Sequence, residues 1–414
     1  MSEEQREEEG RCPVTDWATD YDIMDPDYVR DPAPYWDDLR ERCPIAHTDR
    51  WGGSWMPTRY ADLQEMVRMV PALSSASPGV IPPPEELREQ LISERRQYGS
   101  ENPPITADPP EQKPYKQLIL PFFTPKAVAE YRPITEQLCH DLMDRVIAKG
   151  NADAAADYAE QIPPRVIAHM MGIDHTRADE FVEWTRGLLE LGQSRPKMRI
   201  KYRNIIRDFF ADLVTERRAN PGDDMISTLI DSEVEGKPLT DYTVIGICNL
   251  ILLAGIDTTW SSIGASLWHL AGHREDRQRL YAEPELFPSA VEELLRFYSP
   301  VKMGRKVTEP VTMGDVTMQP GDKVILNFPA ANRDPEVFDR PNEVVLDRQK
   351  NRHIAFGIGI HRCAGSNLAR MEMEVGLRIW FERTKDFELT DADAVRWAGG
   401  QVRGPRIVPV RVTA

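Results

Sequence analysis

Hydrophobic residues recur at helical spacing through most of the chain. The strongest such segment runs from residue 241 to about residue 270, and its first half is apolar nearly all round. A helix with this pattern has no polar face to turn to water, so we expect it to be buried on every side. Proline or polar breaks separate the other helical segments, which are predicted over residues 35–42, 86–96, 126–149, 163–171, 177–191, 197–218, 288–298 and 364–381.

Strand-like alternation is confined to short stretches near the two ends of the helical region. Two pieces around residues 45–47 and 54–56 are separated by a Gly-Gly pair. Residues 301–327 alternate between turns at Gly314-Asp315 and Pro320-Gly321, and residues 387–412 alternate around a second Gly-Gly pair. The sequence therefore predicts a mainly α fold with a small β region.

Length and composition place these elements in one body. No linker divides the 414 residues, so we expect a mobile N-terminal arm over 1–20 and a single domain over 21–414.

The formal net charge of −16 argues against nucleic acid or an anionic membrane as a partner. The acidic start lacks the apolar core of a signal peptide, and the longest uninterrupted apolar run, residues 250–254, is too short to span a bilayer. Five cysteines without paired spacing indicate reduced thiols, and we expect a cytoplasmic protein.

One cysteine stands apart from the other four. Cys363 lies in a segment with Gly357, Gly359 and Gly365, just before a predicted helix. Unpaired N–H groups at a helix N-terminus stabilise a thiolate, and the glycines let a flat partner approach the sulfur. Phe356 can shield one side of it. The remaining cysteines are interpreted as small buried hydrophobic residues.

The segment around Cys363 resembles the haem-ligand loop of the cytochrome P450 family, F-x-x-G-x-[HR]-x-C-x-G, at every position. The resemblance extends from Tyr35 to the C-terminus and is to soluble bacterial members of the camphor-hydroxylase-like group. It implies the cytochrome P450 fold, with haem b (iron protoporphyrin IX) between the long central helix and the cysteine loop. The Cys363 thiolate would hold the iron, and its electron donation favours O–O cleavage.

An acid and an alcohol lie side by side in the otherwise apolar long helix. Burying Asp257 costs several kcal/mol unless the carboxylate is paired or functional, while the Thr258 hydroxyl can bond back to the carbonyl of Ala254. Taken alone, these two residues are explained equally well by a helix that merely tolerates a threonine and a paired aspartate, without a catalytic role. The segment matches the family pattern [AG]-G-x-[DE]-T, which implies that Thr258 and Asp257 deliver protons for the cleavage of dioxygen.

Glu293 and Arg296 are spaced three residues apart on one predicted helix. Such a pair is most often an exposed one of little energetic value. The resemblance implies instead a buried structural pair behind the cysteine loop, the family's E-x-x-R. Where relatives have a third arginine this chain has glutamate, and either Arg340 or Arg348 can substitute.

The resemblance also implies contacts to the haem. Its propionates would meet Arg305, His361 and the helix beginning near Glu111, where Gln112 and Lys116 replace the more usual histidine and arginine. Lysine keeps the charge but loses the bidentate fork. The further cofactor-binding residues implied are Phe356, Gly365 and Ala254.

The substrate pocket implied by the resemblance is mostly apolar, with Gln401 as a hydrogen-bonding group. The proline-rich segment 74–108 is compatible with surface disorder or with a lid, and the resemblance favours substrate access. A break between Ser194 and Met198 would form the roof. The pocket residues are Leu250, Leu253, Val301, Met303, Gln401 and Val402.

Four cations are expected near the surface closest to the thiolate. Lys113, Lys116, Arg352 and Arg362 are either scattered solvated charges or a basic patch that docks an acidic ferredoxin. The chain has no G-x-G-x-x-G motif and no cluster-binding cysteines, so an external electron donor is needed.

We therefore expect a haem-thiolate monooxygenase that inserts one oxygen atom from O₂ into a small or medium-sized apolar organic substrate, with electrons from a ferredoxin and its reductase. A peroxide-driven peroxygenase is one alternative, and a non-catalytic haem-binding sensor is another. The proton-delivery motif argues against both.

Overall fold

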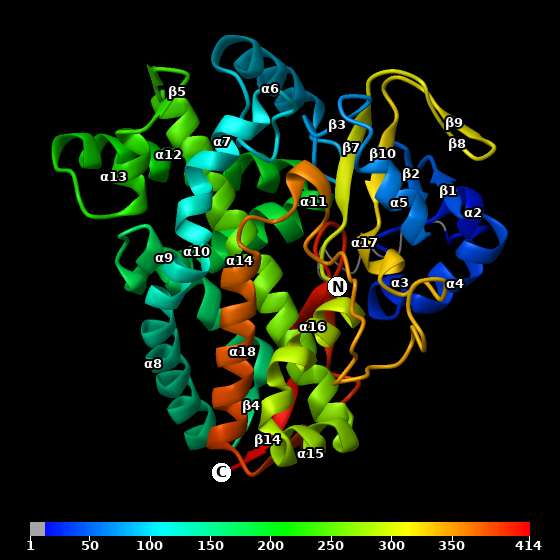
Figure 1. The fold of residues 1–414 in the computed structure, drawn as a ribbon, viewed down its shortest axis with the longest axis vertical. Helices are drawn as coiled ribbons and strands as arrows, with labels where there is room; N and C mark the ends of the chain where they lie inside the picture. Colours follow the sequence, from blue (N-terminus) through cyan, green and yellow to red (C-terminus); the bar gives the residue numbers. More distant parts are fainter. Residues whose placement is uncertain (1–12) are drawn as a thin grey trace.

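Helix α14, Asp241–Gly272, runs through the centre of the molecule (Figure 1). The computed structural model describes residues 13–414. The side chain of Thr240 caps the helix by accepting a hydrogen bond from the Thr243 N–H. Helices α9 (Ile162–Met170), α12 (Pro196–Ala219) and α18 (Ser366–Arg383) pack against it. The prediction of a long buried helix is confirmed, except on the face around Ala254, which is exposed.

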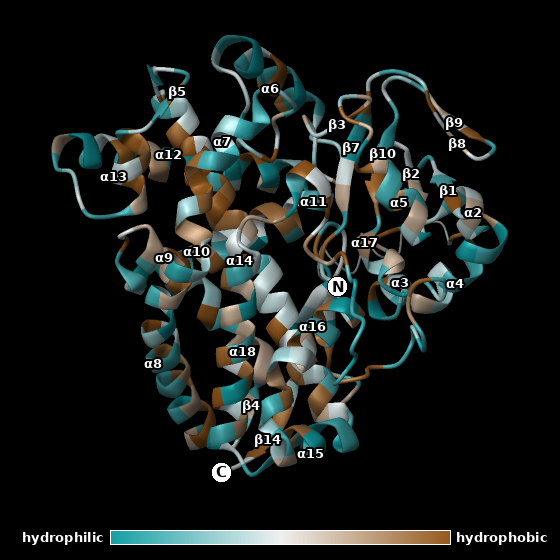
Figure 2. Cartoon of the chain, viewed as in Figure 1, coloured by the Kyte–Doolittle hydropathy of each residue, from teal (hydrophilic) through white to brown (hydrophobic). Residues whose placement is uncertain are grey.

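Among the described residues, α14 is the one helix whose length and composition would let it cross a membrane. However, 72% of its most apolar window is buried inside the fold. A helix surrounded by protein needs no lipid to cover it, so this apolar pattern is that of a core helix. Figure 2 shows brown, hydrophobic segments along α14, whereas the peripheral helix α15 (Arg274–Ala282) is mainly teal.

The remaining helices surround this core, and they include the other helices that the hydrophobic spacing predicts as well as several, mostly short, that it does not. Helix α18 packs along α8 (Pro125–Lys149) (Figure 1). The helices not yet named are α2 (Trp17–Asp20), α3 (Pro26–Arg30), α4 (Ala33–Arg42), α5 (Tyr60–Met66), α6 (Glu85–Tyr98), α7 (Gln112–Ile119), α10 (Ala178–Arg186), α11 (Gly192–Ser194), α13 (Met225–Ile230), α16 (Phe287–Phe297) and α17 (Phe328–Ala331).

The strands form small sheets at the edges of the helical body. The largest sheet has five strands in the order β1-β2-β10-β7-β3, in which β10 pairs antiparallel with β7 and parallel with β2. A three-stranded sheet has the order β11-β14-β4. The strands are β1 (Ile45–Thr48), β2 (Ser54–Pro57), β3 (Leu73–Ser74), β4 (Asn151–Asp153), β5 (Glu233–Val234), β6 (Lys237–Pro238), β7 (Met303–Val307), β8 (Val311–Met313), β9 (Val316–Met318), β10 (Lys323–Leu326), β11 (Asp386–Leu389), β12 (Arg396–Ala398), β13 (Gly404–Ile407) and β14 (Pro409–Thr413).

Two predicted helices differ from the structure at their ends. The helix expected over 177–191 stops at Arg186 and continues as a π turn, Gly187–Leu191. At Gly187 a Cβ atom would lie only 2.1 Å from the ring of Tyr202, so close packing against α12 fixes the residue there. The helix expected from residue 364 begins at Ser366. Cys363 therefore lies in the loop before the helix and not within its first turn.

The N-terminal arm expected over 1–20 falls partly outside the described residues. Its described end contains helix α2, which contacts β1 and buries Ala18.

The proline-rich segment 74–108 lies against β7, because Gly304 has no side chain. A Cβ atom at Gly304 would meet the carbonyl oxygen of Gly79 at 2.4 Å. The start of this segment is thus held against β7.

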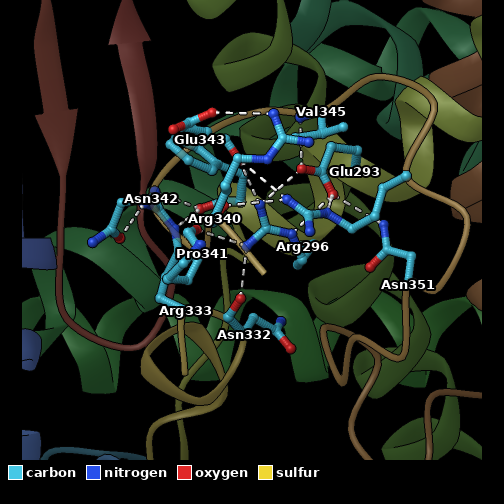
Figure 3. A network of polar contacts seen from close by, with 12 residues as sticks. Glu293, Arg296, Asn332, Arg333, Arg340, Pro341, Asn342, Glu343, Val345 and Asn351 are labelled. Carbon is cyan, nitrogen blue, oxygen red and sulfur yellow. Dashed lines mark hydrogen bonds and ion pairs between the residues drawn. The ribbon is translucent and has the colours of Figure 1, made fainter. Parts of the chain in front are cut away.

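A buried network of charges joins α16 to the loop that follows α17 (Figure 3). Glu293 and Arg296 are both 0% exposed, and the guanidinium donates two hydrogen bonds of 2.8 and 2.7 Å to the carboxylate. Arg296 also donates to the carbonyl oxygens of Asn332, Pro341 and Glu343. Arg348, rather than Arg340, supplies the second guanidinium, at 2.9 Å from Glu293 Oε2. The network fixes the chain that leads to Cys363.

We predict that Arg348→Ala lowers the stability of the protein by about 2 kcal/mol, because a buried carboxylate loses one charged hydrogen-bond donor. The measurement is the free energy of unfolding from a urea titration. Arg340→Ala is the matched control, since the Arg340 side chain is 53% exposed and its ion pairs are 3.4 and 3.5 Å long. That variant should change stability by less than about 0.5 kcal/mol. Equal losses in the two variants would contradict the assignment of Arg348.

Candidate active site

A cavity of about 460 Å³ lies between α14 and the loop that carries Cys363. Segment 74–108, the turn before α12 and the end of the C-terminal β region complete its walls. The sequence analysis placed fourteen residues around a cofactor or substrate, and all of them line this one cavity. They are Gln112, Lys116, Leu250, Leu253, Ala254, Val301, Met303, Arg305, Phe356, His361, Cys363, Gly365, Gln401 and Val402.

The backbone around Cys363 turns sharply and is closed by its own hydrogen bond. The Cys363 N–H donates to the carbonyl oxygen of Phe356 at 2.8 Å. Gly357 and Gly359 have φ angles of 64° and 73°, a conformation that residues with side chains rarely adopt. At Gly365 a Cβ atom would lie 4.0 Å from the Cys363 sulfur. The loop therefore presents the sulfur with little around it.

Cys363 is exposed although protein surrounds it, because its exposed surface faces the cavity. Burial raises the pKa of the Cys363 thiol, while the Gly365 N–H and then Lys116, Arg362 and Arg370 act to lower it. The sequence analysis considered only the lowering effect. Since a coordinated thiol is deprotonated by the metal itself, this environment suits a sulfur that binds a metal centre.

Two basic side chains beside the cavity have no carboxylate bonded to them. Arg305 is buried and its one hydrogen bond among the described residues goes to the carbonyl oxygen of Gly304, while His361 Nε2 is buried without a partner. Burial lowers the pKa of Arg305 to about 10 and that of His361 to about 4. Asp108 opposes both shifts, but its carboxylate is bonded to Ser74 and Ser75. Both side chains are therefore available for an anionic group in the cavity.

Gln112 and Lys116 project from α7 onto the cysteine loop. Gln112 Nε2 donates to the carbonyl oxygen of Ile360 at 2.9 Å, and Lys116 Nζ donates to those of Ile360 and Arg362 at 2.6 and 2.9 Å. Their amide and ammonium groups thus position the loop. Of the four cations expected in a surface patch, Lys113, Arg352 and Arg362 are exposed, whereas Lys116 is half-buried.

Thr258 and Asp257 point to different sides of α14. Thr258 lines the cavity, and its hydroxyl donates to the carbonyl oxygen of Ala254 at 2.8 Å, as expected from the sequence. Asp257 is buried and does not line the cavity. Its carboxylate accepts hydrogen bonds from Arg406 Nη2 at 2.8 Å and from Ser261 Oγ at 3.2 Å. The Asp257 carboxylate thus lies on the core side of α14, whereas the Thr258 hydroxyl faces the cavity.

Arg406 is a member of the site that the sequence analysis missed. It lies on β13, 149 residues from Asp257, and also donates to Glu190 Oε2 at 2.8 Å. Burial raises the pKa of Asp257, and Arg406 is the strongest opposing charge. Glu160, which is bonded to Arg186, lies close enough for its charge to act on Arg406. No local motif marks these residues, because only the fold brings β13 against α14.

Comparisons with known proteins decide the family. The family model for cytochrome P450 matches residues 165–385. Cytochrome P450 107B1 of Saccharopolyspora erythraea is 32% identical over 86% of this chain and 89% of its own length. The chain belongs to the cytochrome P450 family. Steroid C26-monooxygenase of Mycolicibacterium smegmatis is 34% identical over 75% of this P450 and 79% of the relative.

Solved structures agree with this assignment. The bacillaene polyketide synthase cytochrome P450 PksS of Bacillus subtilis superposes with a TM-score of 0.84 at 28% identity, covering 95% of this P450 and all of that chain. CYP109E1 of Bacillus megaterium, solved with testosterone, also gives 0.84, at 27% identity over 94% of this P450 and all of that chain. The expected fold, family and enzyme class are thereby confirmed.

Cytochromes P450 bind haem b through a cysteine thiolate, and the residues of this P450 fit that cofactor. The cavity-facing Cys363 would hold the iron. Arg305 and His361, with no acid bonded to them, would hold the propionates. The small residues Gly365 and Ala254 line the same cavity.

We predict that Arg406→Met destabilises the protein by about 3 kcal/mol, because it leaves the Asp257 carboxylate buried without its cation. Thermal unfolding of the haem-loaded protein is the measurement. Adding Asp257→Asn in the same chain should recover part of the loss, since a neutral amide is cheaper to bury than an isolated carboxylate. If the double variant is no more stable than Arg406→Met, the ion pair is not what Arg406 contributes.

Proposed function

We propose that this P450 inserts one oxygen atom from O₂ into a small or medium-sized apolar organic substrate, using electrons from an external ferredoxin and ferredoxin reductase. The observation that carries the proposal is the cavity itself, in which the Cys363 thiol and the Thr258 hydroxyl share one largely apolar space. When bound, haem supplies the redox chemistry of dioxygen activation. The protein positions the substrate, delivers protons and excludes water.

Thr258 would hold and pass on a proton at its Oγ1 atom. Its hydroxyl donates its hydrogen to the Ala254 carbonyl oxygen, so the lone pairs of Oγ1 remain free to accept a hydrogen bond from a donor in the cavity. Behind it, the Asp257 and Glu190 carboxylates accept hydrogen bonds from Nη2 and Nε of Arg406, which lie on the same edge of the guanidinium. An arginine does not release its proton, so Arg406 would hold the two carboxylates near each other, and this arrangement supports proton supply to α14 by the carboxylates.

The apolar walls support an apolar substrate. Leu250, Leu253 and Val301 surround the space beside Thr258, and Gln401 adds one amide. Water expelled from such a site strengthens the polar interactions that remain. The steroid and testosterone named for two of the similar proteins are compatible with a substrate of this kind.

An acidic ferredoxin is supported by the exposed cations Lys113, Arg352 and Arg362 on a chain of net charge −16. Local positive charge on an otherwise acidic protein directs an acidic partner to one face. Lys116 contributes little to this patch, because its ammonium group is bonded to loop carbonyls.

We infer that the enzyme works in the cytoplasm, where its free cysteines would stay reduced.

The decisive test is the carbon monoxide difference spectrum of the reduced protein. Wild type should show the absorption band of sulfur-ligated iron, and Cys363→Ala should lose it because no other thiol within residues 13–414 lines the cavity. Cys139→Ala is the matched control, since Cys139 is buried elsewhere in the core. It should keep the band. A band that survives in Cys363→Ala would refute the assignment.

Replacing Thr258 separates the monooxygenase from the peroxide-driven alternative. Thr258→Ala should keep consuming NADH with a ferredoxin system while product per NADH falls about 10-fold and hydrogen peroxide rises, because proton delivery is impaired. Thr258→Ser keeps the hydroxyl and should recover coupling. Turnover with peroxide alone that is insensitive to Thr258→Ala would favour the peroxygenase. No NADH consumption with any ferredoxin and substrate would favour the haem-binding sensor.

A further inference from the structure

Arg199 lines the cavity with a positive charge that no acidic side chain neutralises. Its Nη1 atom donates to the carbonyl oxygens of Ile81 and Pro82, both at 3.1 Å. Within residues 13–414, no carboxylate lies within ion-pair distance of this guanidinium. Burial lowers the pKa of Arg199, and Glu101 is the charge that opposes the shift.

Arg203, one helical turn after Arg199, is a cation whose charge is paired with two carboxylates. Arg203 donates to Glu101 Oε1 at 2.8 Å and to Glu94 Oε2 at 2.7 Å. Both nearby carboxylates are thus bonded to Arg203. Arg199 shares their neighbourhood but receives no ion pair, so its charge faces the cavity uncompensated.

A second cation lies behind the same loop. Lys323 on β10 is buried, and its Nζ atom donates to the carbonyl oxygen of Gly79 at 2.6 Å. Burial lowers the pKa of Lys323 to about 7, followed by the charges of Arg199, Arg88 and Lys306. Half-buried Arg199 and buried Lys323 therefore both bond to the segment 79–82, and among the described residues their hydrogen-bond partners are carbonyl oxygens.

This polar end of the cavity has a defined geometry. The Gly304 N–H donates to the carbonyl oxygen of Pro78 at 2.7 Å, which holds the loop against β7. A Cβ atom at Gly79 would lie 3.4 Å from Arg199 Nη2 and 3.8 Å from Gln401 Oε1, so both groups meet at this position. Gln401 and Arg199 thus lie together, in the same cavity as Thr258 and Cys363.

We propose that Arg199 binds the carboxylate of a substrate whose apolar body occupies the cavity towards Thr258. This deepens the proposed function and rests on it. The two Nη1 hydrogens of Arg199 are engaged, whereas Nε and Nη2 make no hydrogen bond among the described residues. These two nitrogens form one edge of the guanidinium, whose parallel N–H groups match the two oxygens of a carboxylate. An anion there would also neutralise a cation that is costly to bury alone.

The test compares matched acids and esters by optical titration of the ferric haem-loaded enzyme at pH 8. The probes are straight-chain fatty acids of 8, 12 and 16 carbons and their methyl esters. The acid-to-ester affinity ratio of wild type should fall about 10- to 100-fold in Arg199→Gln, the loss expected for a charged hydrogen bond, with ester affinity unchanged. Arg199→Lys keeps the charge without the fork and should lie between the two.

Arg88→Gln is the matched control, because Arg88 is exposed and belongs to the same group of cations but does not line the cavity. Its acid-to-ester ratio should stay within about 2-fold of wild type, as expected for a screened surface charge. A ratio unchanged in Arg199→Gln, an equal loss of acid and ester, or no acid binding at any chain length would overturn the proposal. So would dodecyl sulfate depending on Arg199 when dodecanoate does not.

The carbon monoxide spectrum of every variant separates this inference from the proposed function. A normal sulfur-ligated band with an unchanged acid-to-ester ratio rejects the carboxylate site alone. Loss of the band in wild type rejects the proposed function itself.

Discussion

A single sulfur atom has to face an internal cavity while the backbone around it is held still. The loop before α18 has no ladder of regular hydrogen bonds, so other contacts must fix it. The Cys363 N–H bonds to Phe356, Gly357 and Gly359 adopt positive φ angles, and Lys116 holds two loop carbonyls. Further back, the Glu293 network anchors the chain that leads into the loop. The haem site depends on these supports because they set the direction of the sulfur.

The acidic and basic groups around the active site of this P450 differ in how they are paired. Glu293 and Asp257 lie in the core and are bonded to arginines. Among the described residues, the guanidinium groups of Arg305 and Arg199 and the neutral imidazole of His361 line the cavity with no acid bonded to them. An unpaired buried charge is unfavourable in the folded protein alone. The missing partners therefore mark the places where the anionic groups of ligands are expected.

Neighbouring residues of α14 serve different compartments. Successive helical residues are rotated by about 100°, so Thr258 can line the cavity while Asp257 points into the core. The hydroxyl is thereby set beside the substrate, and the carboxylate is kept in contact with Arg406. The helix separates the reaction space from the ionisable groups that would feed it with protons.

The sequence by itself determined the central helix, the cysteine loop and the Thr258 back-bond, because each follows from local spacing or a contiguous motif. The lining of the cavity came from the family resemblance. It left open whether Arg340 or Arg348 joins Glu293, and it could not find Arg406 or the unpaired Arg199. Those answers depend on which segments meet in space, such as β13 against α14 or residues 79–82 against α12. Only the tertiary structure decided them, since a charge is paired or unpaired according to neighbours that lie far away along the chain.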